Sequence, residues 1–124
     1  MFEREWGFYL DDMIKFCEKV LSYTEQLDQE GFETDVKSYD ATLRNLELLG
    51  EAASHIPEAI RELSSTIPWR QVVATRNRLI HGYLGIDNDI LWSIVQDDIP
   101  VLLQELKKLK CSASVGIGLL GRLI

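Results

Sequence analysis

Apolar side chains recur at helical spacing through most of this chain of 124 residues. In residues 6–28 they fall on one face of an α-helix, and charged residues occupy the other face. The members of this stripe are Trp6, Leu10, Met13, Cys17, Leu21, Thr24 and Leu27. No segment alternates apolar and polar residues with the period of a β-strand. The pattern therefore predicts an all-α fold.

Glycine, proline and capping residues predict the ends of the first helices. Gly31 is expected to end the helix over residues 6–28, because glycine commonly follows the last turn of a helix. Thr34 or Asp35 can cap a second helix, which is expected to end at Pro57. Pro57 then opens a short third helix, since a proline in the first turn has no N–H that would be left unpaired.

The second half of the chain follows the same logic. Pro68 is expected to open a helix that runs to His81, with Gly82 as its stop. The turn over residues 87–89 offers Asp or Asn caps for a last long helix, in which Pro100 should introduce a kink or a restart. Short connections predict a four- to five-helix up-and-down bundle with antiparallel neighbours.

Composition narrows the class of protein. The net charge is −7, and an acidic chain is a poor non-specific binder of nucleic acid because phosphates must be neutralised by cations. Its two cysteines do not form a secreted disulfide framework, and Cys17 lies on the apolar stripe. The amino-terminal segment lacks the apolar core of a signal peptide, and no apolar run could span a membrane. We therefore expect a cytoplasmic protein.

The carboxy-terminal segment departs from the helical pattern. Residues 1–110 form the predicted helical domain, and residues 111–124 form a Gly-rich, apolar tail. Such a tail is expected to dock on a partner or on its own bundle, unless it is a remnant of a vector or a frameshift. Its "GIGLLG" matches a dinucleotide-binding pattern, but that motif requires a preceding strand and a following helix. We therefore set the dinucleotide interpretation aside.

Glu51 and His55 are the only candidate for a metal-binding pair. They lie four positions apart and share a helical face. Helical di-iron proteins, however, use Glu-x-x-His from two helices together with further carboxylates. A polar rim or a hydrogen-bonded pair is the better interpretation, and we expect no metal site.

The segment "RNRLIHGY", Arg76 to Tyr83, concentrates polar groups that could act on a phosphate. Arg70, Arg76 and Arg78 fall within nine residues, which predicts a local positive patch on an acidic chain. The planar guanidinium group suits bidentate contacts with phosphate. At a helix C-terminus, His81 would also be favoured as imidazolium and could move a proton near neutral pH.

A solvated helix end explains the same residues without any chemistry. Arginine and histidine near a helix C-terminus complement the helix dipole, and surface charges are usually solvated. Arg76 and His81 are also five positions apart, which puts them about 140° apart around a helix axis. A shared site would need either the long reach of Arg76 or a second copy of the helix across a dimer interface.

The motif and its surroundings resemble the HEPN superfamily, in particular the HepT-like toxins of bacteria and archaea. "RNRLIHGY" fits Arg-x-x-x-x-His-x-Tyr with a polar residue after the arginine. The resemblance covers residues 8–110, and three further blocks carry it in order: "RNLELLGEAASHIPE" (44–58), "TIPWRQVVATRN" (66–77) and "GYLGIDNDILWSIVQDDIPVL" (82–102).

This resemblance implies an all-α homodimer whose paired motifs form one cleft. It also implies a ribonuclease that needs no metal or other cofactor, in which the ribose 2′-OH of RNA attacks the adjacent phosphate. Arg76 would stabilise the developing charge, His81 would transfer protons and Asn77 would position the substrate or orient His81. Both catalytic roles suit the chemistry of these side chains.

The resemblance further implies a partner and a means of silencing. HepT-like toxins are paired with a minimal nucleotidyltransferase antitoxin, which transfers AMP to the motif tyrosine, here Tyr83. The expected setting is a type II or type VII-like toxin–antitoxin system. The alternative is a non-catalytic helical adaptor that holds substrate for a nucleotidyltransferase, and the acidic composition favours it.

Overall fold

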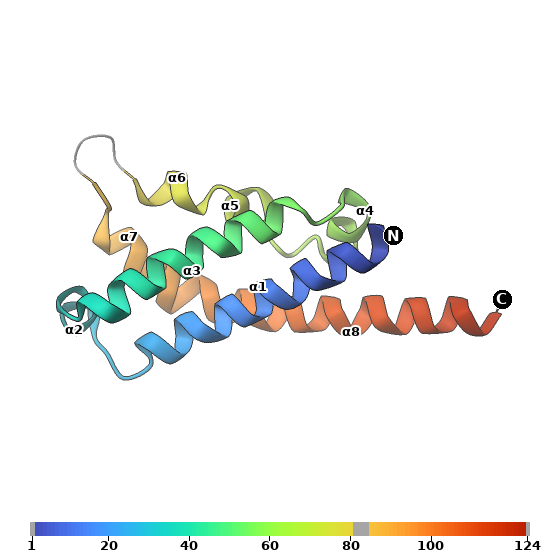
Figure 1. The fold of residues 1–124 in the computed structure, drawn as a ribbon, viewed down its shortest axis with the longest axis horizontal. Helices are drawn as coiled ribbons and strands as arrows, with labels where there is room; N and C mark the ends of the chain where they lie inside the picture. The colour runs from blue at the N-terminus through green and yellow to red at the C-terminus, as the bar shows by residue number, and fades with distance from the viewer. Residues whose placement is uncertain (1, 81–84, 124) are drawn as a thin grey trace.

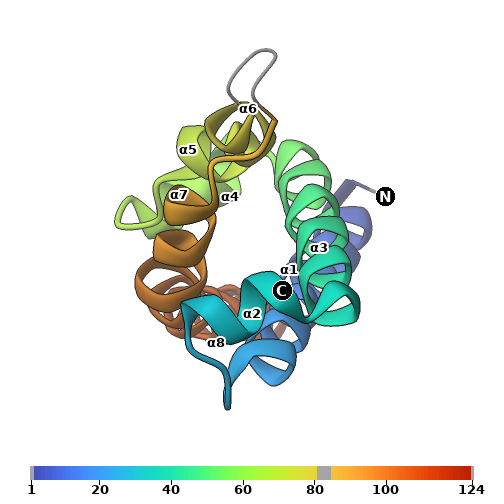
Figure 2. The ribbon, with the colours of Figure 1, turned by 90° about the vertical axis from the view of Figure 1, so that its left-hand side faces the viewer.

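Four antiparallel helical passes form a bundle in the computed structural model, which confirms the predicted all-α up-and-down fold (Figure 1). The structure describes residues 2–80 and 85–123, and side chains within 5–80 and 85–113. The first two passes are α1 (Phe2–Thr24) and α3 (Val36–Ser54), which are joined through the short α2 (Gln29–Thr34). The end-on view shows the passes arranged as a ring around the core (Figure 2).

The other two passes are built from shorter pieces. After α4 (Glu58–Arg61) and the 3₁₀ turn η1 (Glu62–Ser64), the third pass consists of α5 (Trp69–Val73) and α6 (Thr75–Leu79). The fourth consists of α7 (Asn88–Ser93), the π-helical turn η3 (Ile94–Asp98) and α8 (Ile99–Leu123). The third pass packs on α3, α6 contacts α7, and α8 packs on α1.

The predicted stripe of the first helix forms the centre of the core. Trp6, Leu10, Met13, Cys17 and Thr24 are buried there together with Leu46, Leu49, Val95 and Leu106. Burial raises the pKa of the Cys17 thiol to about 12, so this cysteine is a protonated, apolar packing residue.

Local capping explains where the first helices begin and end. The prediction that Gly31 stops the first helix is wrong, because α1 ends at Thr24 and Gly31 lies inside α2. Asp28 caps α2 by accepting a hydrogen bond from the Gly31 N–H at 2.7 Å, which starts a new helix before that glycine. Asp35 is the cap of α3, as predicted, and accepts from the Ser38 N–H.

The prolines and the second acidic cap behave as expected. Pro57 and Pro68 are the N-cap residues of α4 and α5, and Asp87 caps α7 through the N–H groups of Asp89 and Ile90. The predicted restart at Pro100 is also confirmed. The Ile99 N–H donates to Ile94 O over five residues, and this π-turn lets α8 begin with the proline in its first turn.

The backbone of α8 crosses residue 110 without a break and continues to Leu123. Ala113, in the segment predicted to be a tail, is buried against the bundle. The separate role predicted for residues 111–124 stays a prediction. Among the described residues, no helix combines the length and the apolar character that a membrane span requires.

Candidate functional site

Instead of the one helix predicted from Pro68 to His81, the structure has two helices that meet at Ala74, and the second carries Arg76. α5 ends at Val73 and α6 begins at Thr75. The break lies against Gly50 of α3, where an added Cβ would come within 3.2 Å of both Val72 O and Val73 O. A glycine permits this close approach without the shift that a Cβ would demand, and it lies against the point where the segment is broken.

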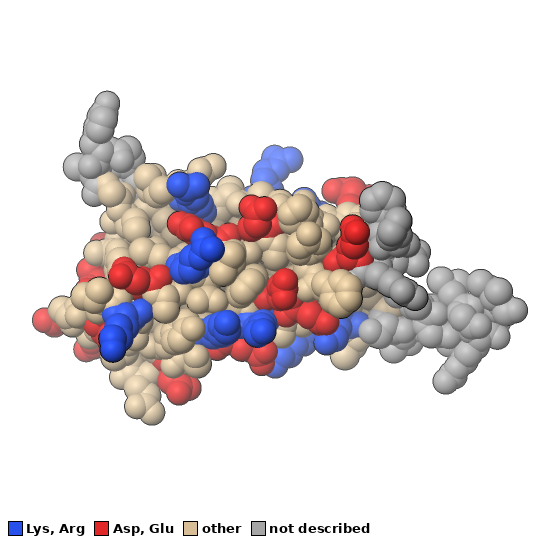
Figure 3. Space-filling model, in the orientation of Figure 1, with Lys and Arg blue, Asp and Glu red and all other residues tan. Residues whose placement is uncertain are grey.

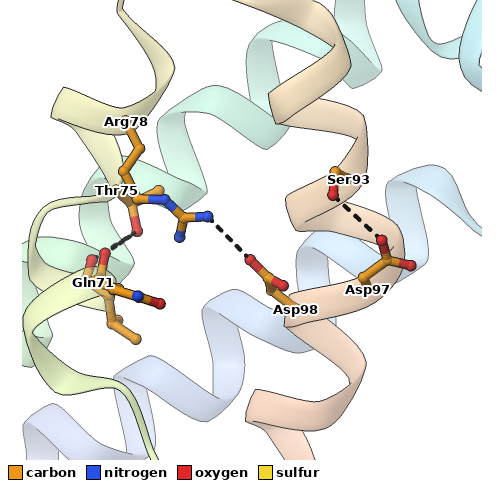
Figure 4. A network of polar contacts seen from close by, with 7 residues as sticks. Gln71, Thr75, Arg78, Ser93, Asp97 and Asp98 are labelled. Atoms are coloured by element: carbon orange, nitrogen blue, oxygen red, sulfur yellow. Dashed lines mark hydrogen bonds and ion pairs between the residues drawn. The ribbon is translucent and has the colours of Figure 1, made fainter.

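Thr75 supplies a hydrogen bond that the broken helix lacks. Its buried hydroxyl donates to Val72 O at 2.7 Å and approaches Gln71 O at 3.3 Å (Figure 4). A side-chain hydroxyl of this kind replaces backbone donors where a helix ends inside the protein. Thr75 therefore stabilises the break that precedes Arg76.

We expect Thr75→Val to lower the free energy of unfolding by about 1–2 kcal/mol, because a buried carbonyl loses its donor while the side-chain volume is preserved. Urea unfolding followed by circular dichroism measures the change. Thr42→Val is the matched control, since the buried Thr42 hydroxyl has no partner within the described part of the chain. Equal losses of stability in the two variants would contradict the role assigned to the Thr75 hydroxyl.

Arg76 lies at the edge of a groove between α3 and the α5–α6 pass, which we call the Arg76 groove. Its volume is about 420 Å³, and Arg44, Glu47, Glu51, Ser54 and Val73 are among its other lining residues. Arg76 is exposed and has no hydrogen-bond or ion-pair partner in the described part of the chain. A guanidinium group in this state is available to bind a phosphate.

Arg78 lies on the same short helix but faces the opposite side. Its guanidinium Nη2 is 3.5 Å from Asp98 Oδ2 of η3, and Figure 4 shows the two side chains pointing toward one another across a cleft. This second cleft, between α6 and the η3–α8 pass, has a volume of about 320 Å³. Arg78 is thus paired with Asp98, a partly exposed contact that faces away from the Arg76 groove.

The predicted positive patch is therefore dispersed. Arg70 lines a third hollow together with the carboxylates of Glu58 and Glu62, so the three arginines face three different places. The face in view in Figure 3 likewise intersperses basic and acidic side chains. Arg76 and Arg78 lie two positions apart on α6, about 200° around its axis, so they face opposite sides. Arg76 alone of the three lines the Arg76 groove.

Asn77 is exposed on α6 and has no hydrogen-bond partner in the described part of the chain. It lines neither the Arg76 groove nor the Arg78 cleft. Its predicted role in positioning substrate or orienting His81 stays a prediction.

His81 and Tyr83 lie outside the described residues, but the residues on either side of them are described. α6 ends at Leu79, and the extended Ile80 forms an antiparallel bridge with Ile86. Next to this bridge, the Asp87 N–H donates a hydrogen bond to Leu79 O at 2.9 Å. The helix predicted to run to His81 therefore ends at Leu79, and the predicted place of His81 in its last turn falls outside the described residues.

Polar side chains fix the start of α7, immediately after Asp87. The Tyr39 hydroxyl donates to Asn88 Oδ1, and Asn88 Nδ2 donates to Glu33 Oε1 at 2.9 Å. Burial, together with the carboxylates of Glu33 and Asp40, raises the pKa of Tyr39, which keeps its hydroxyl protonated as a donor. These contacts tie α7 to α2 and α3.

The two alternative motifs have structural explanations. His55 Nε2 is 3.5 Å from Glu51 Oε1, and the imidazole stacks on Tyr9 with ring centroids 4.4 Å apart. This pair belongs to the α1–α3 contact, and no three potential metal ligands come together anywhere in the described residues. The "GIGLLG" backbone lies inside α8, without the strand and turn that a dinucleotide site requires.

Arg44, which no sequence pattern singled out, also lines the Arg76 groove. It precedes a run of apolar residues on α3, and only the packing of α5 and α6 on this helix brings it to the Arg76 groove. The local sequence "RNLELLGEA" contains the arginine but carries no signal for its distance from residue 76.

Comparison with known proteins agrees with this organisation. The family model for ribonuclease HepT-like proteins matches residues 13–109. "Probable ribonuclease HepT" of Thermococcus cleftensis is 38% identical over 102 residues, which cover 82% of this chain and 93% of the relative. "Putative RNase MJ1380" of Methanocaldococcus jannaschii is 35% identical over 107 residues, which cover 86% and 98%. No solved structure gives a significant match. The chain belongs to the ribonuclease HepT-like family.

Proposed function

We propose that the chain is a metal-independent endoribonuclease and the toxin of a type II or type VII-like toxin–antitoxin system. The observation that carries this proposal is the family match over residues 13–109, which spans the whole motif from Arg76 to Tyr83. The geometry adds support, because Arg76 is exposed at a groove and is not neutralised by a described neighbour. The protein is proposed to act in the cytoplasm.

The proposed reaction moves one bond at phosphorus and needs no cofactor. The ribose 2′-oxygen loses its proton and bonds to the adjacent phosphorus, and the bond from phosphorus to the 5′-oxygen breaks. The departing 5′-oxygen takes up a proton, which leaves a 2′,3′-cyclic phosphate and a 5′-OH. Arg76 stabilises the negative charge that develops on the phosphoryl oxygens, His81 transfers protons, and Asn77 positions the substrate.

A homodimer is proposed to complete the site. The helix that carries Arg76 ends at Leu79, before the segment that contains His81. Pairing of two motifs, each with an arginine and a histidine, would form one cleft from two exposed α5–α6 passes.

AMPylation of Tyr83 by a minimal nucleotidyltransferase antitoxin is the proposed means of silencing. The tyrosine oxygen would attack the α-phosphorus of ATP and release pyrophosphate. The attached AMP would add negative charge and bulk to the motif, so it would oppose RNA binding in the same way as a phosphorylation.

A second candidate function is the non-catalytic adaptor of a nucleotidyltransferase. The charge of −7 and the two glutamates in the Arg76 groove favour it, because they oppose RNA. This adaptor would co-purify with the nucleotidyltransferase and leave RNA intact.

We expect the purified protein to cleave RNA in the presence of EDTA and to leave cyclic phosphate ends, since the reaction uses side chains alone. Gel analysis of a labelled RNA and mass spectrometry of its fragments test this result. Coexpression with an active nucleotidyltransferase should add the mass of AMP to the Tyr83 peptide and abolish cleavage. Intact RNA after incubation with unmodified protein would instead support the adaptor.

A further inference from the structure

Arg44 and Arg76 come from different passes of the bundle and line the same groove. Arg44 is on α3 and Arg76 on α6, and the contact of Gly50 with the backbone at Val72 and Val73 holds these two helices close. Two arginines on the two walls of one groove present separate guanidinium groups to an extended polyanion. A nucleic-acid strand carries successive phosphates along its backbone that two such groups can contact.

The present partner of Arg44 holds it weakly. Its Nη1 is 3.7 Å from Glu47 Oε2, one turn further along α3, and its side chain is 69% exposed. Ion pairs between exposed side chains on one helix face are weak because water screens both charges. A phosphate can offer the guanidinium group bidentate hydrogen bonds, which are stronger than this single long contact.

The charges of the groove explain why both arginines are needed. Glu47 and Glu51 also line it, so the two arginines and two glutamates balance. Arg76 by itself would leave the groove acidic and would repel RNA. Glu51 already lies 3.5 Å from His55 Nε2, whereas Glu47 is positioned to compete with RNA for Arg44.

We propose that Arg44 is a substrate-positioning residue that binds an RNA phosphate next to the one held at Arg76, in exchange for Glu47. This inference rests on the proposed ribonuclease function. It assigns Arg44 to substrate binding and leaves the bond-breaking step to the motif. Its removal should therefore act on affinity and KM, with little change in kcat.

The test uses the full chain and an uncleavable RNA, a single-stranded oligonucleotide with 2′-O-methyl riboses. For Arg44→Gln we expect a several-fold higher Kd at low salt and a slope of log K against log salt that is smaller by about 0.7, the value for one phosphate contact on a single strand. Glu47→Gln should have the opposite effect on Kd, since it frees Arg44. Arg78→Gln is the matched control, because Arg78 is held by Asp98 in the other cleft.

Cleavage of the unmodified RNA by the same proteins separates the possible failures. If the wild type neither binds nor cleaves RNA, the proposed function is wrong, and this inference with it. If the wild type cleaves RNA and Arg44→Gln keeps its KM and salt slope, only the inference is overturned. Equal losses in Arg44→Gln and Arg78→Gln would overturn it too, since general charge would then explain both. Glu47→Gln provides an independent readout if Arg44→Gln is unstable.

Discussion

Arg76→Ala should lower kcat for RNA cleavage by about 10²–10³-fold, the usual effect of removing one preorganised donor from a developing negative charge. The guanidinium group lines the groove and has no partner in the described part of the chain, so its removal leaves no buried carboxylate unpaired. We therefore expect the fold to be retained. Single-turnover cleavage of a labelled RNA, measured in EDTA, gives the rate.

Arg78→Ala separates the position of Arg76 from the general charge of this segment. It removes the same charge two residues away, but from a side chain that faces Asp98 across the other cleft. We expect a small loss of stability, below about 1 kcal/mol, and a cleavage rate near that of the wild type. A comparable loss of rate in both variants would show that the arginines act through net charge alone, and the role of Arg76 would be withdrawn.

His81→Ala should reduce cleavage by about 10²–10⁴-fold, since a positioned general acid or base contributes this much to proton transfer. His81→Gln should be equally inactive, because glutamine can donate a hydrogen bond but does not titrate. The measurement is the same EDTA-resistant cleavage assay, followed across pH to locate the ionisation that the variants lack.

His55, the other histidine of the chain, provides the control for His81. His55 stacks on Tyr9 and lies beside Glu51, and His55→Ala should alter stability while leaving the cleavage rate close to that of the wild type. Residual cleavage that is equal in the wild type and in His81→Ala would point to a contaminating nuclease and would remove His81 from the mechanism.

Features that depend on neighbours along the chain could be predicted from the sequence. The stripe over residues 6–28 predicted the buried face of α1, and the observed caps Asp35 and Asp87 were among the predicted candidates. Each follows from contacts between residues three or four positions apart, which a single helix or its first turn determines. The prediction that Gly31 ends a helix was wrong, because Asp28 caps a new helix, α2, that contains this glycine.

The candidate site depended on contacts that the linear sequence does not display. The sequence from Pro68 predicts one helix, yet the structure has two helices that meet at Ala74, beside the point where Gly50 of α3 approaches the backbone. Arg76 and Arg78 lie two positions apart on α6 and face opposite sides of it, so Arg76 lines one groove, Arg78 faces Asp98, and the predicted shared patch does not form. The role of Arg44 has the same origin.

The sequence by itself determined the all-α class, most of the positions where helices begin and the family motif, because helical periodicity, caps and motifs are properties of neighbouring residues. Only the tertiary structure decided that Arg76 lines a groove with no partner among the described residues, that Arg78 faces Asp98, and that the distant Arg44 shares the groove. The physical reason is that close approach between helices, such as that permitted by Gly50, depends on residues far apart in the chain. The packing of α3 against α5 and α6, close at Gly50, brings Arg44 and Arg76 to one groove.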